Sequence, residues 1–373
     1  MQIAVREMKL GEQSAVEGLF YRSLGAIDRL VFKLSFQEAQ KSARKQLGGT
    51  LVAECEGKIV GAVSMRIQTI KGKQTGFVDA LVADKQFRGR GVGKSLVDGA
   101  VSWLEQRGCV VIYATADRYN SPSWNLFIHR GFGVYEVPRQ LKDYGLSFLR
   151  LWLVEFYLVG FGTFFLRYSK NQTSAETGAA WHWLGALLGV SAVWWIQLLR
   201  SQGPLTLFPL VLGVTALSLL AHELSQKLVA RRFGLPATFK AWGSGILFSW
   251  LLALTGLFFP AYGSTYIKQL DWRYNPAKDK TGVIFFAGSL VSLAFAFAFW
   301  ALSVLESTDL VLSLARVGYN LNLIIVVFNL LPIKAAGGFV WDGKKILEWS
   351  KTAWVALAIA TAALIALSVI VQF

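Results

Sequence analysis

The stretch Phe-Val-Asp-Ala-Leu-Val at 77–82 leads, after a short connection, into Arg-Gly-Arg-Gly-Val-Gly-Lys at 88–94. The first run favours a strand, and the apolar residues that follow the second recur at helical spacing. A glycine-rich turn between a strand and a helix is typical of an anion site, because backbone N–H groups approach a phosphate there and the helix N-terminus adds partial positive charge. Arg88, Arg90 and Lys94 add formal charge. Taken alone, the run is also compatible with a flexible turn.

The surrounding sequence indicates an α+β unit. A tight turn at Glu56-Gly57 separates two β-rich runs, and one or two helices are expected in the forty residues after the first strand. A further helix is predicted from Asn120 to Phe132, ended by Gly131 before a last strand. The predicted strands, besides 77–82, are Ile3–Arg6, Thr50–Cys55, Lys58–Arg66 and Val110–Ala114.

Two motifs, Arg-x-x-Gly-x-Gly at 88–93 and Leu-Phe-x-x-x-Gly-Phe at 126–132, resemble those of the GNAT family of acyl-CoA N-acyltransferases. The resemblance covers about residues 1–142 and implies a mixed sheet that opens near its third long strand, with acetyl-CoA in the gap. It also implies cofactor contacts of the pantetheine with Leu81 and Val82, of the thiol with Asn120, and of the pyrophosphate with the backbone of Arg88, Gly89, Arg90, Gly91, Val92, Gly93 and Lys94.

Acetyl transfer to an amine needs a base for the ammonium proton and often an acid for the leaving thiolate. Asp79, in the strand before the glycine-rich turn, is the candidate base, and a solvent-facing strand carboxylate is an equally good interpretation. Where the family commonly carries Tyr, this chain has Phe127, which cannot donate a proton. The thiolate would then leave unassisted or through water. His129 is better explained as a solvated helix residue than as a replacement acid.

The composition shows that much of the chain lies in lipid. Of its 373 residues 54% are hydrophobic and 16% charged, against about 25% charged in ordinary soluble domains. The net charge of +15 does not indicate a nucleic-acid partner, because most of the 14 Trp lie in apolar runs after residue 150, not among basic residues. Two unpatterned cysteines and a polar N-terminal run argue against a disulfide framework and a cleaved signal peptide.

Apolar runs long enough to cross a ~30 Å hydrocarbon core recur from residue 144 onward. Two segments are ambiguous: 145–166 contains Arg150 and Glu155, and 243–262 is interrupted by Gly and Pro. Membrane helices are predicted at about 179–199, 205–230, 281–303, 310–331 and 352–372. We therefore expect three parts: a GNAT-like acyl-CoA-binding domain at 1–142, an interfacial amphipathic linker at 143–178, and an α-helical polytopic membrane domain at 179–373.

The run Ala-His-Glu-Leu-Ser-Gln-Lys-Leu-Val-Ala-Arg-Arg-Phe-Gly at 221–234 places ionisable residues in a predicted membrane helix. Such residues are costly in lipid and are functional candidates. In HExxH zinc peptidases two His, four residues apart, bind zinc from one helix face, and the Glu activates the bound water. His222 and Glu223 fit that spacing, and Gln226 stands where the second His would be.

This run resembles the site-2 protease family of intramembrane zinc metallopeptidases. Two later segments resemble its other motifs: Ala-Gly-Ser-Leu-Val-Ser at 287–292, and Phe-Asn-Leu-Leu-Pro at 328–332 followed by Asp342-Gly343. The resemblance covers about 180–350. It implies Glu223 as the catalytic base and zinc ligands at the positions of His222, Gln226 and Asp342.

Gln226 leaves two interpretations open. A Gln carbonyl oxygen can ligate a metal, but zinc sites overwhelmingly use His, Cys, Asp and Glu. The site is then either a weakened zinc centre of His222, Gln226 and Asp342, or a pseudoprotease that keeps the fold with little or no peptidase activity. The plainest alternative, a helix contact satisfied by His222 and Glu223, is disfavoured because three separate segments agree in order.

Membrane topology can be predicted from the same elements. His222 and Asp342 meet only if an even number of crossings separates them, so 243–262 is expected to be a re-entrant or interfacial loop. Thirteen Lys and Arg then lie on one side, in the loops 167–178, 231–280 and 332–351, against Arg200 alone in the loops of the other side. The positive-inside rule places the richer side in the cytosol. Acetyl-CoA, which the GNAT resemblance implies as cofactor, is cytosolic, so the N-terminal domain is expected there too.

Three functions fit these expectations. The first is a membrane-anchored acetyltransferase that modifies an amine on a protein or small molecule. The second is an intramembrane zinc protease that cleaves a transmembrane protein and is regulated by acyl-CoA binding. The third is a non-catalytic adaptor that senses acetyl-CoA. It is suggested by Phe127 and Gln226, which stand where the two families carry a Tyr acid and a His zinc ligand.

Overall fold

The chain folds into two compact units, Met1–Glu176 and Thr177–Lys334 with Val340–Phe373. The computed structural model describes residues 3–23, 48–117, 120–155, 157, 163–170, 178–259, 261–267, 278–305, 308–333 and 340–370. Part of the helical region predicted after the first strand, 24–47, lies outside these described residues.

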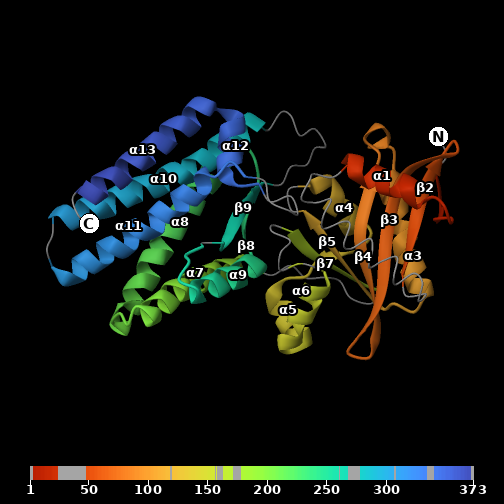
Figure 1. Cartoon of the computed structure of the whole chain (residues 1–373), viewed down its shortest axis with the longest axis horizontal. Coiled ribbons are helices and arrows are strands. Elements are labelled where there is room, and N and C mark those ends of the chain that lie inside the picture. Colours follow the sequence, from red (N-terminus) through yellow and green to blue (C-terminus); the bar gives the residue numbers. More distant parts are fainter. Residues whose placement is uncertain are drawn as a thin grey trace. The chain divides into compact units, whose positions relative to one another are not determined.

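The first unit is built on a seven-stranded mixed sheet in the order β1-β2-β3-β4-β5-β7-β6 (Figure 1). Each neighbouring pair is antiparallel except β4 and β5, which run parallel. The strands are β1 (Ala4–Glu7), β2 (Gly48–Cys55), β3 (Lys58–Ile70), β4 (Lys73–Ala83), β5 (Val111–Asp117), β6 (Gly133–Val134) and β7 (Thr163–Ser169).

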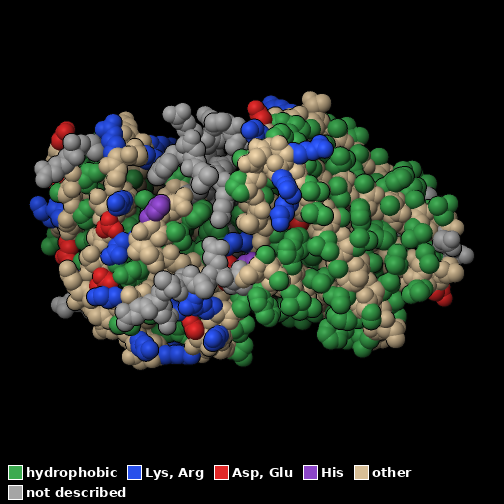
Figure 2. Space-filling model, turned by 180° about the vertical axis from the view of Figure 1, so that it is seen from behind, with side chains coloured by type: hydrophobic (Ala, Val, Ile, Leu, Met, Phe, Trp, Pro, Cys, Tyr) green, Lys and Arg blue, Asp and Glu red, His purple; other side chains and the backbone are tan. Residues whose placement is uncertain are grey.

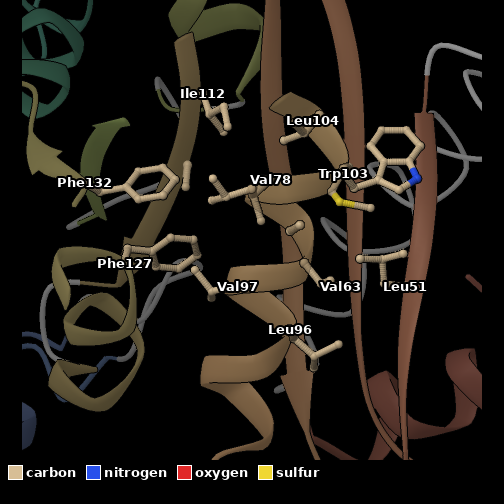
Figure 3. Packing of buried hydrophobic residues seen from close by; sticks show 14 of the residues in the cluster. Leu51, Val63, Val78, Leu96, Val97, Trp103, Leu104, Ile112, Phe127 and Phe132 are labelled. Carbon is tan, nitrogen blue, oxygen red and sulfur yellow. The ribbon is translucent and has the colours of Figure 1, made fainter. Parts of the chain in front are cut away.

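Helices cover both faces of this sheet. Helix α3 packs on Val63 and Val78 (Figure 3), whereas α1 packs on Ala62 and Val82. Neighbouring strand residues point to opposite faces, so the two helices lie on opposite sides. The helices of the unit are α1 (Gln13–Ser23), α3 (Val92–Gln106), α4 (Ser121–His129), α5 (Val137–Tyr144) and α6 (Phe148–Val154), with 3-10 turns η1 (Lys85–Phe87) and η2 (Gly145–Ser147).

Strand β7 corrects the predicted boundary at residue 142. It pairs with β5 from Val111 to Asp117 and with β6, so the region 143–178 includes an interior strand of the sheet and is not a separate linker. Several apolar residues of 145–166 are core residues of the first unit, among them Leu151, Trp152 and Phe165, whereas Leu146 and Leu153 are exposed. A strand buried on both faces is continuously apolar, and periodicity alone does not distinguish it from a lipid-facing segment.

Within the described residues, five helices of the second unit are long and apolar enough to cross a membrane. They confirm the prediction of a helical region with five long apolar segments after the first domain. On the face that Figure 2 shows, apolar side chains cover most of this unit. The exposed large apolar residues of the unit include Leu220, Leu224 and Leu228. The helices are α7 (Ala179–Arg200), α8 (Phe208–Arg232, preceded by the 3-10 turn η3, Leu205–Leu207), α10 (Lys278–Leu305), α11 (Asp309–Leu330) and α13 (Lys351–Ile370).

The ambiguous segment 243–262 contains a short apolar helix, α9 (Gly243–Leu254), which is not among the membrane-crossing candidates. It connects β8 (Ala237–Ala241) to β9 (Gly263–Ile267), and these two strands pair antiparallel. A second short helix, α12 (Asp342–Trp349), precedes α13. The short elements bring polar side chains to the long helices.

Candidate functional site

The glycine-rich turn lies at the N-terminus of α3. Gly89 and Gly91 have φ of +74° and +87°, in the left-handed region that strains other residues. A Cβ at either position would meet nothing within 4 Å, so space is open beside the turn, whereas a Cβ on Gly93 would lie 2.7 Å from Leu126. Arg88, Arg90 and Lys94 are exposed. The first-turn N–H groups of a helix lack intrahelical partners, so this geometry suits an anion.

The sheet opens between its two parallel strands. Pairing runs from Thr75 opposite Val111 to Val78 opposite Ala114, although both strands continue further. The last residues of β4 therefore have no β5 partner. Leu81 lies half-buried in this open section, and Val82 packs under α1. The expected opening is present, and its wall is the strand that leads to the glycine-rich turn.

Asp79, the predicted base, is the extra residue of a β-bulge in β4. The register with β3 shifts between Ser64 and Met65, which leaves Asp79 without a counterpart. Its carboxylate accepts two 2.6 Å hydrogen bonds from Arg66, and its side chain is 2% exposed. The interpretation as a solvent-facing carboxylate is therefore wrong, because a buried ion pair holds the side chain.

A second carboxylate faces the same arginine. Glu155 follows α6, and its Oε1 lies 3.8 Å from an Arg66 terminal nitrogen, which also donates to the backbone carbonyl of Val154. Burial, reinforced by the negative charge of Asp79 and opposed by Arg66, raises the pKa of Glu155 to about 8. Sequence reasoning missed both Arg66 and Glu155, since nothing local links a strand residue to one about ninety positions later.

The residues of α4 have different surroundings. Asn120 caps the helix, its Oδ1 accepting from the Ser123 N–H at 3.3 Å. Phe127 is a core residue whose ring packs edge-on against Phe132, with centroids 5.2 Å apart (Figure 3). His129 is exposed at the end of α4, as expected for a solvated residue. In this arrangement Phe127 serves packing.

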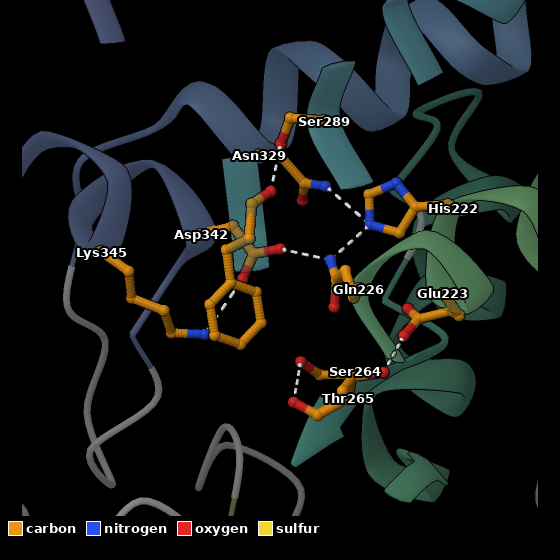
Figure 4. Close-up of polar contacts among 10 residues, drawn as sticks. His222, Glu223, Gln226, Ser264, Thr265, Ser289, Asn329, Asp342 and Lys345 are labelled. Atoms are coloured by element: carbon orange, nitrogen blue, oxygen red, sulfur yellow. Dashed lines mark hydrogen bonds and ion pairs between the residues drawn. The ribbon is translucent and has the colours of Figure 1, made fainter. Parts of the chain in front are cut away.

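In the second unit the three predicted ligand positions meet (Figure 4). His222 and Gln226 lie one turn apart on α8, and Asp342 begins α12. The Gln226 Nε2 is 2.9 Å from His222 Nε2 and 3.3 Å from Asp342 Oδ2. All three residues are buried. The fold thus joins positions more than a hundred residues apart into one cluster.

These side chains do not fit a resident zinc ion as they stand. An amide NH₂ between an imidazole nitrogen and a carboxylate oxygen donates to both, so His222 Nε2 carries its lone pair and Nδ1–H donates to Ser292 Oγ, 2.9 Å away. Gln226 Oε1 is buried without a hydrogen-bond partner among the described residues. Those residues also contain no group of three or more His, Cys, Asp and Glu able to hold a metal.

Glu223 is held by the strand that follows α9. Thr265 Oγ1 donates to its Oε2 at 2.6 Å, and the Tyr262 hydroxyl also hydrogen-bonds the carboxylate. Figure 4 shows Glu223 pointing toward Thr265, while Gln226 reaches toward Asp342. The segment 243–262, predicted as a re-entrant or interfacial loop, and the strand that follows it therefore contribute side chains to the site.

Four residues complete this cluster without having been assigned a role from the sequence. Ser292 holds the His222 ring, Asn329 Nδ2 lies 3.4 Å from His222 Nε2, and Lys345 pairs with Asp342 at 3.0 Å. Gly288 lets α10 pass closely, because a Cβ there would lie 2.5 Å from Gln226 Nε2. Three of the four lie in or beside the motif segments, and Lys345 follows Asp342 by three residues.

The chain was compared with known proteins. Residues 21–133 match the profile of the acetyltransferase (GNAT) family. The first unit contains a GNAT acetyltransferase domain. Among solved structures, the chain is similar to ribosomal-protein-alanine N-acetyltransferase from Brucella melitensis (17% identity, 44% of this chain, 99% of that chain, TM-score 0.33). It is also similar to PaiA N-acetyltransferase from Thermoplasma acidophilum in complex with coenzyme A (12% identity, 45% and 99%, TM-score 0.33).

The chain also matches a curated protein whose name points to a different family. A Methanocaldococcus jannaschii protein named "Putative zinc metalloprotease" is 33% identical over 135 residues, which is 36% of this chain. The chain is a distant homologue of that protein and spans 66% of its length. The GNAT domain and a distant metalloprotease relationship thus occur in one chain.

Proposed function

We propose that the GNAT domain transfers an acetyl group from acetyl-CoA to an amine, on a protein or a small molecule, while the apolar helices anchor it in the bilayer. The observation that supports this most directly is the open space beside Gly89 and Gly91 at the N-terminus of α3. The section of β4 unpaired from β5 lies just before it in the chain.

The proposed cofactor contacts divide the acetyl-CoA molecule among these features. The pyrophosphate would lie on the backbone from Arg88 through Gly89, Arg90, Gly91, Val92 and Gly93 to Lys94, where helix N–H groups and three cations favour negative charge. The pantetheine would lie beside Leu81 and Val82, whose backbone groups β5 leaves unpaired. Asn120, at the start of α4, would lie near the thiol. Because Phe127 is in the core, the leaving thiolate would take its proton from water.

Calorimetry of acetyl-CoA binding to the full chain tests the loop. Gly91→Glu places a carboxylate and a strained residue at the anion site, and we expect binding to weaken by more than about tenfold. Gly57→Glu is the matched control, because Gly57 has φ +76° and open space but lies in the turn between β2 and β3. Equal binding by both variants and the wild type would contradict the proposal.

For the second unit we propose a peptidase-like fold that has lost peptidase activity. What supports this is the Gln226 amide between His222 and Asp342, in the position where a shared ion would need to lie. The competing function is zinc-dependent cleavage of a transmembrane protein, with His222, Gln226 and Asp342 as ligands and Glu223 as base. Zinc analysis of the purified chain against His222→Ala separates the two: a zinc content that falls in the variant would favour the peptidase.

Placement of the GNAT domain in the cytosol is part of the proposal. It rests on the eleven basic residues of 231–280 and 332–351, the two segments between membrane helices assigned to that side, and on the cytosolic supply of acetyl-CoA. A domain on the other face would have no cofactor.

A further inference from the structure

Arg66 of the GNAT domain lies beside two carboxylates and hydrogen-bonds only one of them. Its bidentate contact with Asp79, both hydrogen bonds 2.6 Å long, uses two of the guanidinium N–H groups. Glu155 lies 3.8 Å away, beyond hydrogen-bond distance, with a side chain that is 2% exposed. Its Oε1 has no hydrogen-bond partner within the described part of the chain. A buried carboxylate with so little compensation is stabilised by a second cation or by taking up a proton.

The chain contains the same combination at its surface. Arg6 contacts Glu12 and Glu54, at 2.7 and 2.6 Å, and all three side chains are 22–30% exposed. Both glutamates there are hydrogen-bonded, and the pKa of Glu12 is lowered to about 2, chiefly by its hydrogen bonds to Arg6. The surface cluster is therefore exposed and fully hydrogen-bonded, whereas in the buried cluster Glu155 has only a long ion pair with Arg66 and no hydrogen bond to its Oε1 among the described residues.

The buried cluster lies where an acyl acceptor is needed. Asp79 is the bulged residue at which β4 loses its pairing with β5. Phe77, beside Arg66, contacts the Tyr113 ring and faces away from α3, because its neighbour Val78 packs on α3 and adjacent strand residues point to opposite faces. The glycine-rich turn therefore borders the opening of the sheet on the face covered by α3, and the cluster of Arg66, Asp79 and Glu155 borders it on the other face. The second substrate would enter from the face of the cluster.

We infer that Glu155 binds the ammonium group of the acyl acceptor and takes its proton, and that Asp79, held by Arg66, is a positioning residue. This assignment rests on the proposed acetyl transfer and moves the base from Asp79 to Glu155, whose Oε1 has no hydrogen bond among the described residues. The chemical class of acceptor is a primary amine that enters as a cation, because an ammonium ion supplies the charge that Arg66 does not.

In each turnover the nitrogen of the acceptor loses two protons. Glu155 takes one proton from the ammonium ion, and the free amine attacks the thioester carbonyl, so that a C–N bond forms and the C–S bond breaks. Nitrogen loses its second proton to water as the amide forms, and the CoA thiolate takes one proton from water. One proton is released overall, and Glu155 returns its own to solvent. A base whose pKa lies near 8 is well matched to this step at neutral pH.

Release of CoA thiol by the full chain in detergent tests the assignment, with methylamine, spermidine and a peptide with a free N-terminus as probes. Glu155→Gln, which keeps the shape of the side chain, is expected to lower kcat/KM by about 100-fold or more and to change acetyl-CoA affinity less than about twofold. Glu155→Asp should recover part of the loss, and Glu12→Gln, the matched control in the exposed cluster, should leave kcat/KM within about twofold of wild type.

The pH profile separates positioning from packing. Wild-type kcat/KM should rise with pH to a plateau above about 8, as Glu155 ionises, and Glu155→Gln should lose this rise. Asp79→Asn frees Arg66 for Glu155 and should move the rise to lower pH. If Glu155→Gln is as active as a wild type that does transfer acetyl, the inference is overturned and the proposed function stands. If the wild type binds no acetyl-CoA, or acetylates none of the amines, both are overturned.

Discussion

The side-chain nitrogen of Gln226 lies 2.9 Å from Nε2 of His222 and 3.3 Å from a carboxylate oxygen of Asp342. One amide group thus hydrogen-bonds the two atoms that a metal ion would otherwise join. Both contacts of the Gln226 NH₂ group are made within the cluster, whereas Gln226 Oε1 has no hydrogen-bond partner among the described residues. A buried polar atom without a hydrogen bond costs free energy of folding, so Gln226 Oε1 destabilises the cluster.

Replacing the amide should create a metal centre. Gln226→His completes two His and one Asp, a donor set that zinc accepts, and we expect about one zinc ion per purified chain. Metal analysis by mass spectrometry measures this, with the double variant Gln226→His/His222→Ala as the control that loses the zinc. A wild-type chain that already holds a full equivalent of zinc, lost on His222→Ala, would refute the hydrogen-bonded interpretation.

The close passage of α10 against α8 should depend on Gly288. A Cβ in Gly288→Ala would lie 2.5 Å from Gln226 and 2.9 Å from the His222 ring, so we expect a destabilisation of about 1–3 kcal/mol. Thermal unfolding of the full chain in detergent measures it. Gly213→Ala on α8 is the matched control, since nothing lies within 4 Å, and helix propensity alone should leave it neutral or slightly stabilised. Equal midpoints for the two variants would disprove the steric argument.

The stability of the first unit should fall as pH rises. The pKa of Glu155 is raised from 4.5 to about 8, so the folded state binds more protons than the unfolded state between these values. The stabilisation is complete below about 4.5 and is lost as pH passes 8. Amide exchange of β4 and β7 peptides in the full chain, corrected for the chemical exchange rate, should show several-fold more opening at pH 8.5 than at pH 5.5. Glu155→Gln should show much less dependence, and an unchanged dependence would contradict the assignment.

The proposed orientation can be tested with single cysteines. Ser201→Cys, in the short loop with Arg200, should react with an impermeant thiol reagent added outside intact cells, and Ser350→Cys should not. The two natural cysteines, Cys55 and Cys109, are buried and should give little background. The reverse labelling pattern would place the GNAT domain on the opposite side and would require a different source of acetyl-CoA.

Much of the architecture was predictable because its signals are local. Alternating and helical periodicities located the strand before the glycine-rich turn, helix α3 and five long apolar helices. The turn itself needs glycine at Gly89 and Gly91, a requirement of backbone geometry that is visible in the residue types. Membrane length and charge distribution are likewise properties of contiguous sequence.

Contacts between distant segments were decided only by the tertiary structure. The stretch that became β7 has the apolar character of both a buried strand and a lipid segment, and only its pairing with β5 and β6 distinguishes them. Arg66 hydrogen-bonds Asp79 and contacts Glu155 only at 3.8 Å, because of a bulge and a helix end that no local pattern reveals. The sequence by itself determined which residue types stand at the two sites. Folding decided what each one does, because the direction of a hydrogen bond and the pairing of a buried charge depend on which groups long-range packing brings within about 3 Å.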